Sequence, residues 1–389
     1  MRTINEAGNL SGKKVLVRND FNITIDKEGK ILDDFKLRAS LPTIKYLLEN
    51  EAKIILMSHF GRPEGKVVKS MRLTPIQGIL SDYLSAPIKK VNDCIGLEVE
   101  KAASELKNGE ILLLENLRFY AEEEKNDEEF AKNLAKLGDV FINDAFGACH
   151  RAHASIVNIT KFLPSYAGFL LAREVEVLTK ARDNPERPLT VIIGGVKIST
   201  KIKLIKEYLG KADNVILGGA LANAVLHAQG IAVGKSFVEE GLLPQIQDLA
   251  VANPKLHIPL DVILSVDKSG AAPIRTGPVG KTEENEIILD IGPETEQVFD
   301  SIIRDSKMVI WNGPMGFFEV EQFTHGTKAI AQSIANCSDC FSIAGGGETT
   351  CFIEKMGLIE KFSHVSTGGG AMMEFLAGDK LPGVEVLKD

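Results

Sequence analysis

Positively charged and hydrogen-bonding side chains follow the apolar segments of the first half of the chain, each where a segment ends. They are Asp20, Asn22, His59, Arg62, Arg118, Asp144 and Arg151. Ligands of open parallel sheets bind at the carboxyl ends of the strands, so these side chains are expected at one edge of one sheet. Guanidinium groups bind phosphate and carboxylate oxygens bidentately. One such arginine would be an ordinary surface residue, but their repetition predicts an anion-binding site.

Glycine clusters follow the apolar segments of the second half. They are Gly194–Gly195, Gly218–Gly219, Gly345–Gly347 and Gly368–Gly370. Glycines let backbone amides approach phosphate closely, and a following helix N-terminus adds a favourable dipole. Lys197 and Lys201 follow the first cluster four residues apart, so both are expected on one face of the helix that they begin. Glu348 follows the third cluster, where a carboxylate can hold Mg²⁺ beside phosphate. Together these features predict a nucleotide site.

Short apolar runs alternating with amphipathic stretches must position these residues. The runs span 13–20, 52–59, 110–119, 139–146, 189–195, 214–219, 260–267, 307–314, 341–347 and 362–370. Apolar, β-branched runs without polar alternation indicate strands buried on both faces, hence parallel sheets covered by helices. Helical periodicity appears at 39–50, with Pro42 expected in the first turn, and at 128–138. The alternation predicts an α/β fold built from βαβ units.

The chain has 389 residues, more than one hydrophobic core usually organises, so two domains are expected. A long helix candidate at 166–184 is followed by NPERP at 184–188, which would stop it. We therefore predict an N-terminal α/β domain over 1–165, a connecting helix over 166–187 and a C-terminal α/β domain over 188–375.

Composition narrows the possible partners. Apolar residues make up 44% and charged residues 25%, as in globular proteins, and the formal net charge is −8. Nucleic acid and anionic membranes are therefore not expected partners. No apolar run approaches the roughly 20 residues of a membrane helix, and no secretory signal is visible at the N-terminus, which favours the cytoplasm. Among five cysteines, Cys337 and Cys340 form one CxxC without a second ligand pair, so reduced thiols are expected.

The sequence does not match two common nucleotide-binding motifs, the P-loop and GxGxxG. The segment GPVGKT at 277–282 has Arg275 where the P-loop pattern requires its first glycine, and no buried strand leads into it, so a surface turn is expected. No GxGxxG occurs, which leaves a nicotinamide-dependent dehydrogenase supported only by the α/β pattern.

Nine segments in order resemble phosphoglycerate kinase over essentially the whole chain. They span 15–22, 58–63, 112–119, 141–155, 194–201, 289–295, 311–319, 345–349 and 366–376. The resemblance implies two Rossmann-like domains joined by a long helix and separated by a cleft. It implies reversible phosphoryl transfer between ATP and the carboxylate of 3-phosphoglycerate, giving ADP and 1,3-bisphosphoglycerate. It also implies that a C-terminal tail, about 376–389, packs on the N-terminal domain.

The resemblance also implies roles for individual residues. The phosphoglycerate site would comprise Asp20, Phe21, Asn22, Lys36, His59, Arg62, Arg118 and Arg151. The nucleotide site would comprise Lys201, Gly292, Asn312, Glu319, Gly346, Gly347, Glu348 and Thr349. The groups acting on the transferring phosphoryl group would be Lys36, Lys197, Gly369 and Gly370. Glu348 would hold Mg²⁺.

The chain departs from the family pattern at a few positions. In DDFKL at 33–37, Lys36 stands where the family has an arginine, so the charge is kept but the planar fork is lost. Arg38 lies two residues further on, about 200° round a helix, and cannot take over. Thr200 and Glu348 each replace an aspartate, and Ile23-Thr24 replaces Val-Pro. These changes leave open a second hypothesis, a non-catalytic relative that binds nucleotide or phosphoglycerate.

The implied chemistry needs no general base, because the acceptor carboxylate is already ionised at neutral pH. Catalysis then consists of alignment and stabilisation of charge on the transferring group. The histidines His59, His150 and His153 are expected to orient ligands or support the structure. We expect a monomer in which both substrates drive closure about the 166–188 helix, bringing Arg62 and Arg151 toward Lys197.

Overall fold

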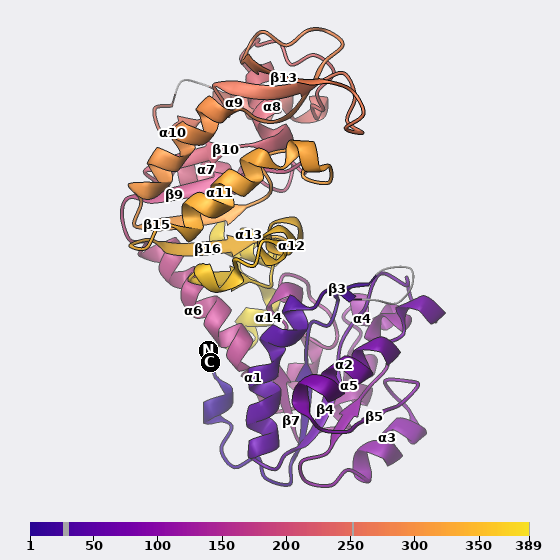
Figure 1. Cartoon of the computed structure of the whole chain (residues 1–389). Helices are drawn as coiled ribbons and strands as arrows, with labels where there is room; N and C mark the ends of the chain where they lie inside the picture. The colour runs from indigo at the N-terminus through magenta and orange to yellow at the C-terminus, as the bar shows by residue number, and fades with distance from the viewer. Residues whose placement is uncertain (26–30, 251–252, 389) are drawn as a thin grey trace. The chain divides into compact units, whose positions relative to one another are not determined.

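The computed structural model describes residues 1–25, 31–250 and 253–388. The chain forms two compact units (Figure 1). Unit 1 comprises Met1–Val177 together with the C-terminal segment from Asp379, and unit 2 comprises Leu178–Gly378. The division falls inside helix α6 (Phe169–Asp183), the long helix expected over 166–184. No helix within the described residues is long and apolar enough to cross a membrane.

Unit 1 is built on a six-stranded parallel sheet with the order β5-β6-β4-β1-β7-β8. The strands are β1 (Lys14–Arg18), β4 (Lys53–Met57), β5 (Ile88–Lys90), β6 (Ile111–Leu113), β7 (Val140–Asn143) and β8 (Ser165–Ala167). A short antiparallel pair, β2 (Thr24–Ile25) and β3 (Ile31–Asp33), precedes the first helix. Strand β1 lies between β4 and β7, so the residues that follow these three strands share one edge.

Helices cover both faces of this sheet. They are α1 (Phe35–Glu49), α2 (Thr74–Leu84), α3 (Leu97–Ser104), α4 (Ala121–Glu124) and α5 (Glu128–Ala135). Because strand side chains alternate, Val15 and Val17 of β1 pack with Leu47 of α1 in one apolar cluster. Leu16 packs in the opposite cluster, with Phe130 of α5. This double burial explains why the strands are continuous apolar runs in the sequence.

The prediction that Pro42 lies in the first turn of its helix was wrong. Helix α1 begins at Phe35, so Pro42 lies in its interior and not in its first turn. A proline there has no N–H to donate to the carbonyl of Arg38, one turn earlier. The apolar periodicity from residue 39 marked only the part of the helix that packs on the sheet, and the helix extends a full turn before it.

Unit 2 contains a second six-stranded parallel sheet with the order β11-β10-β9-β15-β16-β17. Its strands are β9 (Leu189–Ile193), β10 (Asn214–Leu217), β11 (Leu256–His257), β15 (Met308–Asn312), β16 (Phe341–Gly345) and β17 (His364–Ser366). The helices around it are α7 (Ile202–Lys211), α8 (Gly219–Ala228), α9 (Leu243–Ala250), α10 (Pro293–Arg304), α11 (His325–Ala335), α12 (Gly347–Lys355) and α13 (Gly370–Leu376). The two parallel sheets with helices confirm the predicted α/β fold.

A small antiparallel sheet in unit 2 was not predicted. It has the order β13-β12-β14, with strands β12 (Asp261–Ser265), β13 (Ile274–Pro278) and β14 (Ile287–Ile291). The expectation that the run at 260–267 joins a parallel sheet was therefore wrong. A parallel neighbour needs a long crossover connection, but only a short loop separates β12 from β13. GPVGKT begins at the end of the exposed strand β13, as a surface segment and not as a P-loop.

The C-terminal segment packs on unit 1. Helix α14 (Pro382–Glu385) lies against the loop after β7, where the Gly383 amide donates to the Cys149 carbonyl at 3.0 Å. The Leu387 carbonyl accepts from the Arg2 amide at 3.0 Å. Cys149 and the other four cysteines are free thiols.

Candidate active site

The carboxyl edge of the unit 1 sheet brings together most of the predicted acid-binding residues. Asp20 follows β1, and its carboxylate accepts a hydrogen bond from the Lys36 ammonium at 2.8 Å. Asn22 accepts from the Gly61 amide at 2.8 Å, and Arg118 donates to the Gly61 carbonyl at 2.9 Å. The segment after β4 is thus fixed between residues that follow β1 and β6, which gives the edge a defined shape.

Three of the predicted residues differ from the rest in exposure. Arg62 and Arg151 are exposed, as side chains that receive an anion from solvent should be. Phe21, in contrast, is fully buried in the apolar core, so only its backbone lies at the edge, where its amide donates to the Ser58 hydroxyl at 2.9 Å. Burial lowers the pKa of Arg118, and the neighbouring Arg151 charge lowers it further.

Beneath the edge lies a buried arginine that the sequence analysis missed. Arg18 is fully buried; its Nε donates to the Ser155 hydroxyl at 2.9 Å, and its Nη2 lies 3.2 Å from Nδ1 of His59. Ser155 in turn donates to the Glu123 carboxylate at 2.6 Å, and Glu123 lies 3.8 Å from Arg18. An arginine inside an otherwise apolar strand segment, VLVR, was a signal in the sequence, because a buried charge must be paired.

This network determines the state of His59. A guanidinium group has only donors, so Nδ1 of His59 accepts and Nε2 carries the ring proton. Burial, the largest effect, and the nearby Arg18, Arg118 and Lys36 charges hold the pKa of His59 well below its usual range, against the opposing effect of Asp20. Burial likewise lowers the pKa of His153 to about 3. Both histidines are therefore neutral at physiological pH.

Asp20 is the ionised carboxylate of the edge. Burial alone would favour its neutral form, but the charge and hydrogen bond of Lys36, together with the Arg18 charge, hold the pKa of Asp20 well below its usual value. The edge therefore presents the ionised Asp20 among cationic donors, one of which, Arg118, also pairs with the Glu124 carboxylate at 3.2 Å. Such a set can bind an anion that also carries a hydroxyl group.

In unit 2, Lys201 is buried at the start of α7. Its ammonium donates to the Gly194 carbonyl, and a Cβ added at Gly313 would lie 2.7 Å from it. Burial lowers the pKa of Lys201 to about 8, with Glu348 opposing that shift. The prediction that Lys197 and Lys201 share a helix face was wrong, because α7 begins only at Ile202. Lys197 lies in the preceding loop, where its side chain is exposed.

The glycine clusters allow close backbone approach. A Cβ added at Gly194 would meet the Pro314 carbonyl at 2.1 Å, and one at Gly219 would meet the Gly195 amide at 2.7 Å. Gly346 has φ +105° and Gly369 has φ +38°, conformations that disfavour a side chain. A Cβ added at Gly369 would be 3.8 Å from the Cα of Gly346, so these two turns are neighbours.

Two predicted nucleotide residues hold the turns together. The Asn312 side chain donates to the Gly345 carbonyl at 2.8 Å, and the Gly313 amide donates to the Thr349 hydroxyl at 2.8 Å. Both side chains are buried and join the ends of β15 and β16. Gly292 is buried against the Asp261 carboxylate, where an added Cβ would lie 2.3 Å from its carbon, so close packing explains the glycine there.

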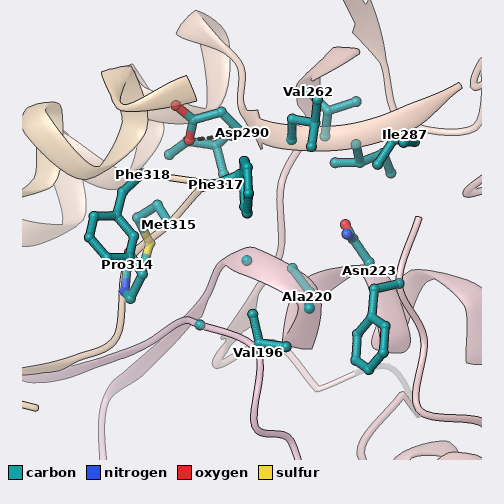
Figure 2. A pocket seen from close by; sticks show the side chains of 18 of the residues that line it. Val196, Ala220, Asn223, Val262, Ile287, Asp290, Pro314, Met315, Phe317 and Phe318 are labelled. Atoms are coloured by element: carbon teal, nitrogen blue, oxygen red, sulfur yellow. Dashed lines mark hydrogen bonds between the residues drawn. The ribbon is translucent and has the colours of Figure 1, made fainter. Parts of the chain in front are cut away.

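A cavity of about 280 Å³ lies beside the glycine turns (Figure 2). Its walls come from the loop after β9, helix α8, strand β14 and the segment 314–319. Most of the lining is apolar, including Val196, Ala220, Ile287, Met315 and Phe317, and Figure 2 shows these side chains around one hollow.

Of the residues that the family resemblance assigns to the nucleotide site, Glu319 and Glu348 line this cavity, and Gly195 and Gly219 of the glycine clusters line it too. The apolar lining escaped sequence analysis because an apolar residue of a pocket has the same pattern as one of the core. An apolar hollow with a few polar groups is the usual setting of a small-molecule site.

Glu348 is an exposed carboxylate in the lining of this cavity. Within the described ranges, no three His, Cys, Asp or Glu residues gather as an all-protein metal site. Mg²⁺ usually takes one or two carboxylates together with substrate phosphates and water, so the donor set around Glu348 fits Mg²⁺ that arrives with a phosphate ligand.

Comparison with known proteins identifies the family. Residues 4–379 match the family model described as phosphoglycerate kinase. The chain is 49% identical over 384 residues to the phosphoglycerate kinase of Moorella thermoacetica, covering 98% of this chain and 97% of that protein. It is 47% identical over 384 residues to that of Dictyoglomus turgidum, covering 98% and 96%.

Two solved structures agree. The phosphoglycerate kinase of Coxiella burnetii superposes with a TM-score of 0.83 at 38% identity, covering 97% of both chains. That of Pyrococcus horikoshii OT3 gives 0.89 at 33% identity, covering 100% of this chain and 98% of the other. Neither a non-catalytic binding protein nor a dehydrogenase is favoured by these matches. The chain belongs to the phosphoglycerate kinase family, enzymes that transfer a phosphoryl group between ATP and the carboxylate of 3-phosphoglycerate.

Proposed function

We propose that unit 1 binds 3-phosphoglycerate, that unit 2 binds ATP with Mg²⁺, and that a cytoplasmic monomer catalyses the transfer. The observation that supports this division is the contrast between the two sheet edges. One carries arginine, lysine and a single ionised aspartate, and the other carries glycine turns beside an apolar cavity.

In unit 1, Arg62, Arg118 and Arg151 would neutralise the phosphate of the substrate. Asp20 would accept a hydrogen bond from the hydroxyl group of the substrate, and neutral His59 would donate a hydrogen bond to the substrate from Nε2. Asn22 would help to fix the orientation through the Gly61 segment that it holds.

In unit 2, the apolar cavity would hold the base of ATP, and Glu319 at its wall would accept from ribose hydroxyl groups. The amides of Gly346 and Gly347, at the start of α12, would bind phosphate oxygens together with Lys201. Glu348 would hold Mg²⁺, which neutralises phosphate charge when bound.

The transfer itself requires no proton abstraction, because the attacking carboxylate is already ionised. Lys36 would align that carboxylate, and Lys197 would stabilise the charge on the oxygens of the transferring group, together with the amides of Gly369 and Gly370. Because each substrate would bind to a different unit, catalysis would require the two units to close and bring the substrates together.

Lys197→Ala tests the proposed transfer. Because Lys197 would act in the transition state, we expect kcat to fall by about 100-fold or more, while KM for both substrates changes little. Steady-state assays with ATP, Mg²⁺ and 3-phosphoglycerate measure this. Lys235→Ala, a change of another exposed lysine of unit 2, is the matched control and should keep full activity. A large rise in KM with kcat intact would remove Lys197 from the transition state.

A further inference from the structure

A buried asparagine interrupts an otherwise apolar helix at the cavity. Asn223 lies on α8 and is 6% exposed, whereas its neighbours Leu221, Ala222, Ala224 and Val225 are at most 1% exposed. It lines the cavity, and Figure 2 shows its carboxamide pointing into the hollow, toward the wall formed by Ile287.

This carboxamide makes no hydrogen bond to another described residue. The carboxamide faces the cavity, so its donor and acceptor are open to a ligand, and asparagine is a poorer helix former than alanine or leucine. The carboxamide is therefore placed to bond a group that enters the cavity.

The other polar groups of the lining are engaged or exposed. The Asp290 carboxylate accepts from the amides of Ile291 and Gly326, both at 2.9 Å. Lys268, Glu319 and Glu348 are exposed. Asn223 is thus the buried side chain, among the described residues that line the cavity, that still offers both a donor and an acceptor.

We propose that Asn223 reads the Watson–Crick edge of a purine base, an inference that rests on the proposed nucleotide site of unit 2. Adenine offers N6–H as donor and N1 as acceptor, and a carboxamide matches this pair. Guanine offers O6 as acceptor and N1–H as donor, which the same carboxamide matches after a half-turn. Asn223 therefore makes the enzyme accept ATP and GTP with similar efficiency.

Substitution of Asn223 separates base contact from general packing. In wild type, kcat/KM for ATP and GTP should agree within tenfold. Asn223→Leu should lower both by a similar factor, about tenfold. Asn223→Asp should favour GTP, because a carboxylate accepts hydrogen bonds from both N1–H and the amino group of guanine. In adenine the same carboxylate would face N1, which is itself an acceptor, and the two would repel each other. The ATP-to-GTP ratio should then fall at least tenfold.

The controls are Asn336→Leu and Asn336→Asp, which make the same changes at an exposed residue of unit 2 outside the cavity; both should match wild type. Thermal melting checks that each variant folds. If Asn223→Asp does not fold, the kinetics of Asn223→Leu alone test the role of Asn223. The proposal is overturned if wild type discriminates more than tenfold, if Asn223→Leu leaves both values unchanged, or if folded Asn223→Asp leaves the ratio unchanged.

A cavity-filling variant distinguishes failure of this inference from failure of the proposed site. Ala220→Phe would occupy the hollow beside Asn223. If Ala220→Phe retains wild-type KM for ATP, the base does not bind in the cavity and the proposed nucleotide site fails. If Ala220→Phe raises that KM but the Asn223 variants behave as wild type, only the base-reading role fails.

Discussion

At the scale of single residues, Lys36 is the position where the resemblance implies an arginine. Its ammonium pairs with the Asp20 carboxylate at 2.8 Å, while Arg38, on the same helix, pairs with Asp34 at 2.7 Å. The two side chains thus have different partners, as their spacing on the helix requires. The charge at position 36 is kept, and the second hydrogen bond of an arginine is lost.

Lys36→Arg should therefore preserve or raise kcat/KM for 3-phosphoglycerate, since it restores a bidentate donor at the same place. Steady-state kinetics measure the effect, with Lys45→Arg, an exposed lysine of the same helix, as control. A large loss of activity would mean that the surroundings of Asp20 accept only lysine.

Titration of Lys201 should make the affinity for ATP depend on pH. Burial holds its pKa at about 8, so the ammonium form dominates below pH 8 and the neutral amine above it. The affinity for ATP should weaken as pH rises from 7 to 9.5, because a cation near the phosphates is lost. Calorimetric titration measures this. Lys201→Arg stays charged and should flatten the profile; equal profiles for both proteins would contradict the role.

At the scale of elements, the start of helix α6 is held by two other elements of unit 1. The Leu171 amide donates to the Asp144 carboxylate, at the end of β7, at 3.2 Å, and the Phe169 amide donates to the Thr43 hydroxyl of α1 at 2.9 Å. Gly168 is required there, because a Cβ would lie 2.2 Å from Asp144 Oδ1. Burial raises the pKa of Asp144 to about 7.

This raised pKa makes stability depend on pH. Between pH 4 and pH 7 the folded carboxyl holds more protons than the unfolded one, so the free energy of unfolding should fall as pH rises through that range. The full effect of Asp144 is at most about 4 kcal/mol. Asp144→Asn should reduce the loss between pH 5 and pH 8, measured by urea unfolding. The exposed Asp82→Asn serves as control, and an unchanged slope in Asp144→Asn would refute the assignment.

The elements themselves were largely predictable. Strands buried on both faces carry continuous apolar runs, which located the inner strands of both parallel sheets and the edge strand β17. The edge strands β5, β8 and β11 were not predicted, because each has only two or three residues and carries no long apolar run. The run at 260–267 was misassigned because an apolar run does not reveal the direction of its neighbours. The start of α7 was placed too early because the glycines and lysines before it match both a loop and a first turn.

The site was predictable only in part. Charged residues at strand ends located the edge of unit 1, and glycine clusters located the turns of unit 2. Buried Arg18 and Asn223 interrupt apolar segments, and that signal could have singled them out. Ala220, Ile287 and Phe317 give no such signal, since a cavity wall and a core have the same composition and differ only in whether the opposite side is filled.

At the scale of the whole molecule, the two proposed half-sites belong to two compact units that share helix α6. The net charge is −8, so anionic substrates are not attracted by the protein as a whole and must be held by the local cations of each unit. The proposed acid-binding edge lies in unit 1 and the proposed nucleotide cavity lies in unit 2. We therefore expect transfer to require closure of the two units, favoured by both substrates together.

Small-angle X-ray scattering tests directly whether closure of the two units requires both substrates. The Lys197→Ala variant, which should bind without turnover, is measured alone, with 3-phosphoglycerate, with Mg-ATP, and with both. We expect the radius of gyration to decrease clearly only with both ligands. An unchanged radius with both ligands present at saturation would contradict it, as would full compaction with either one alone.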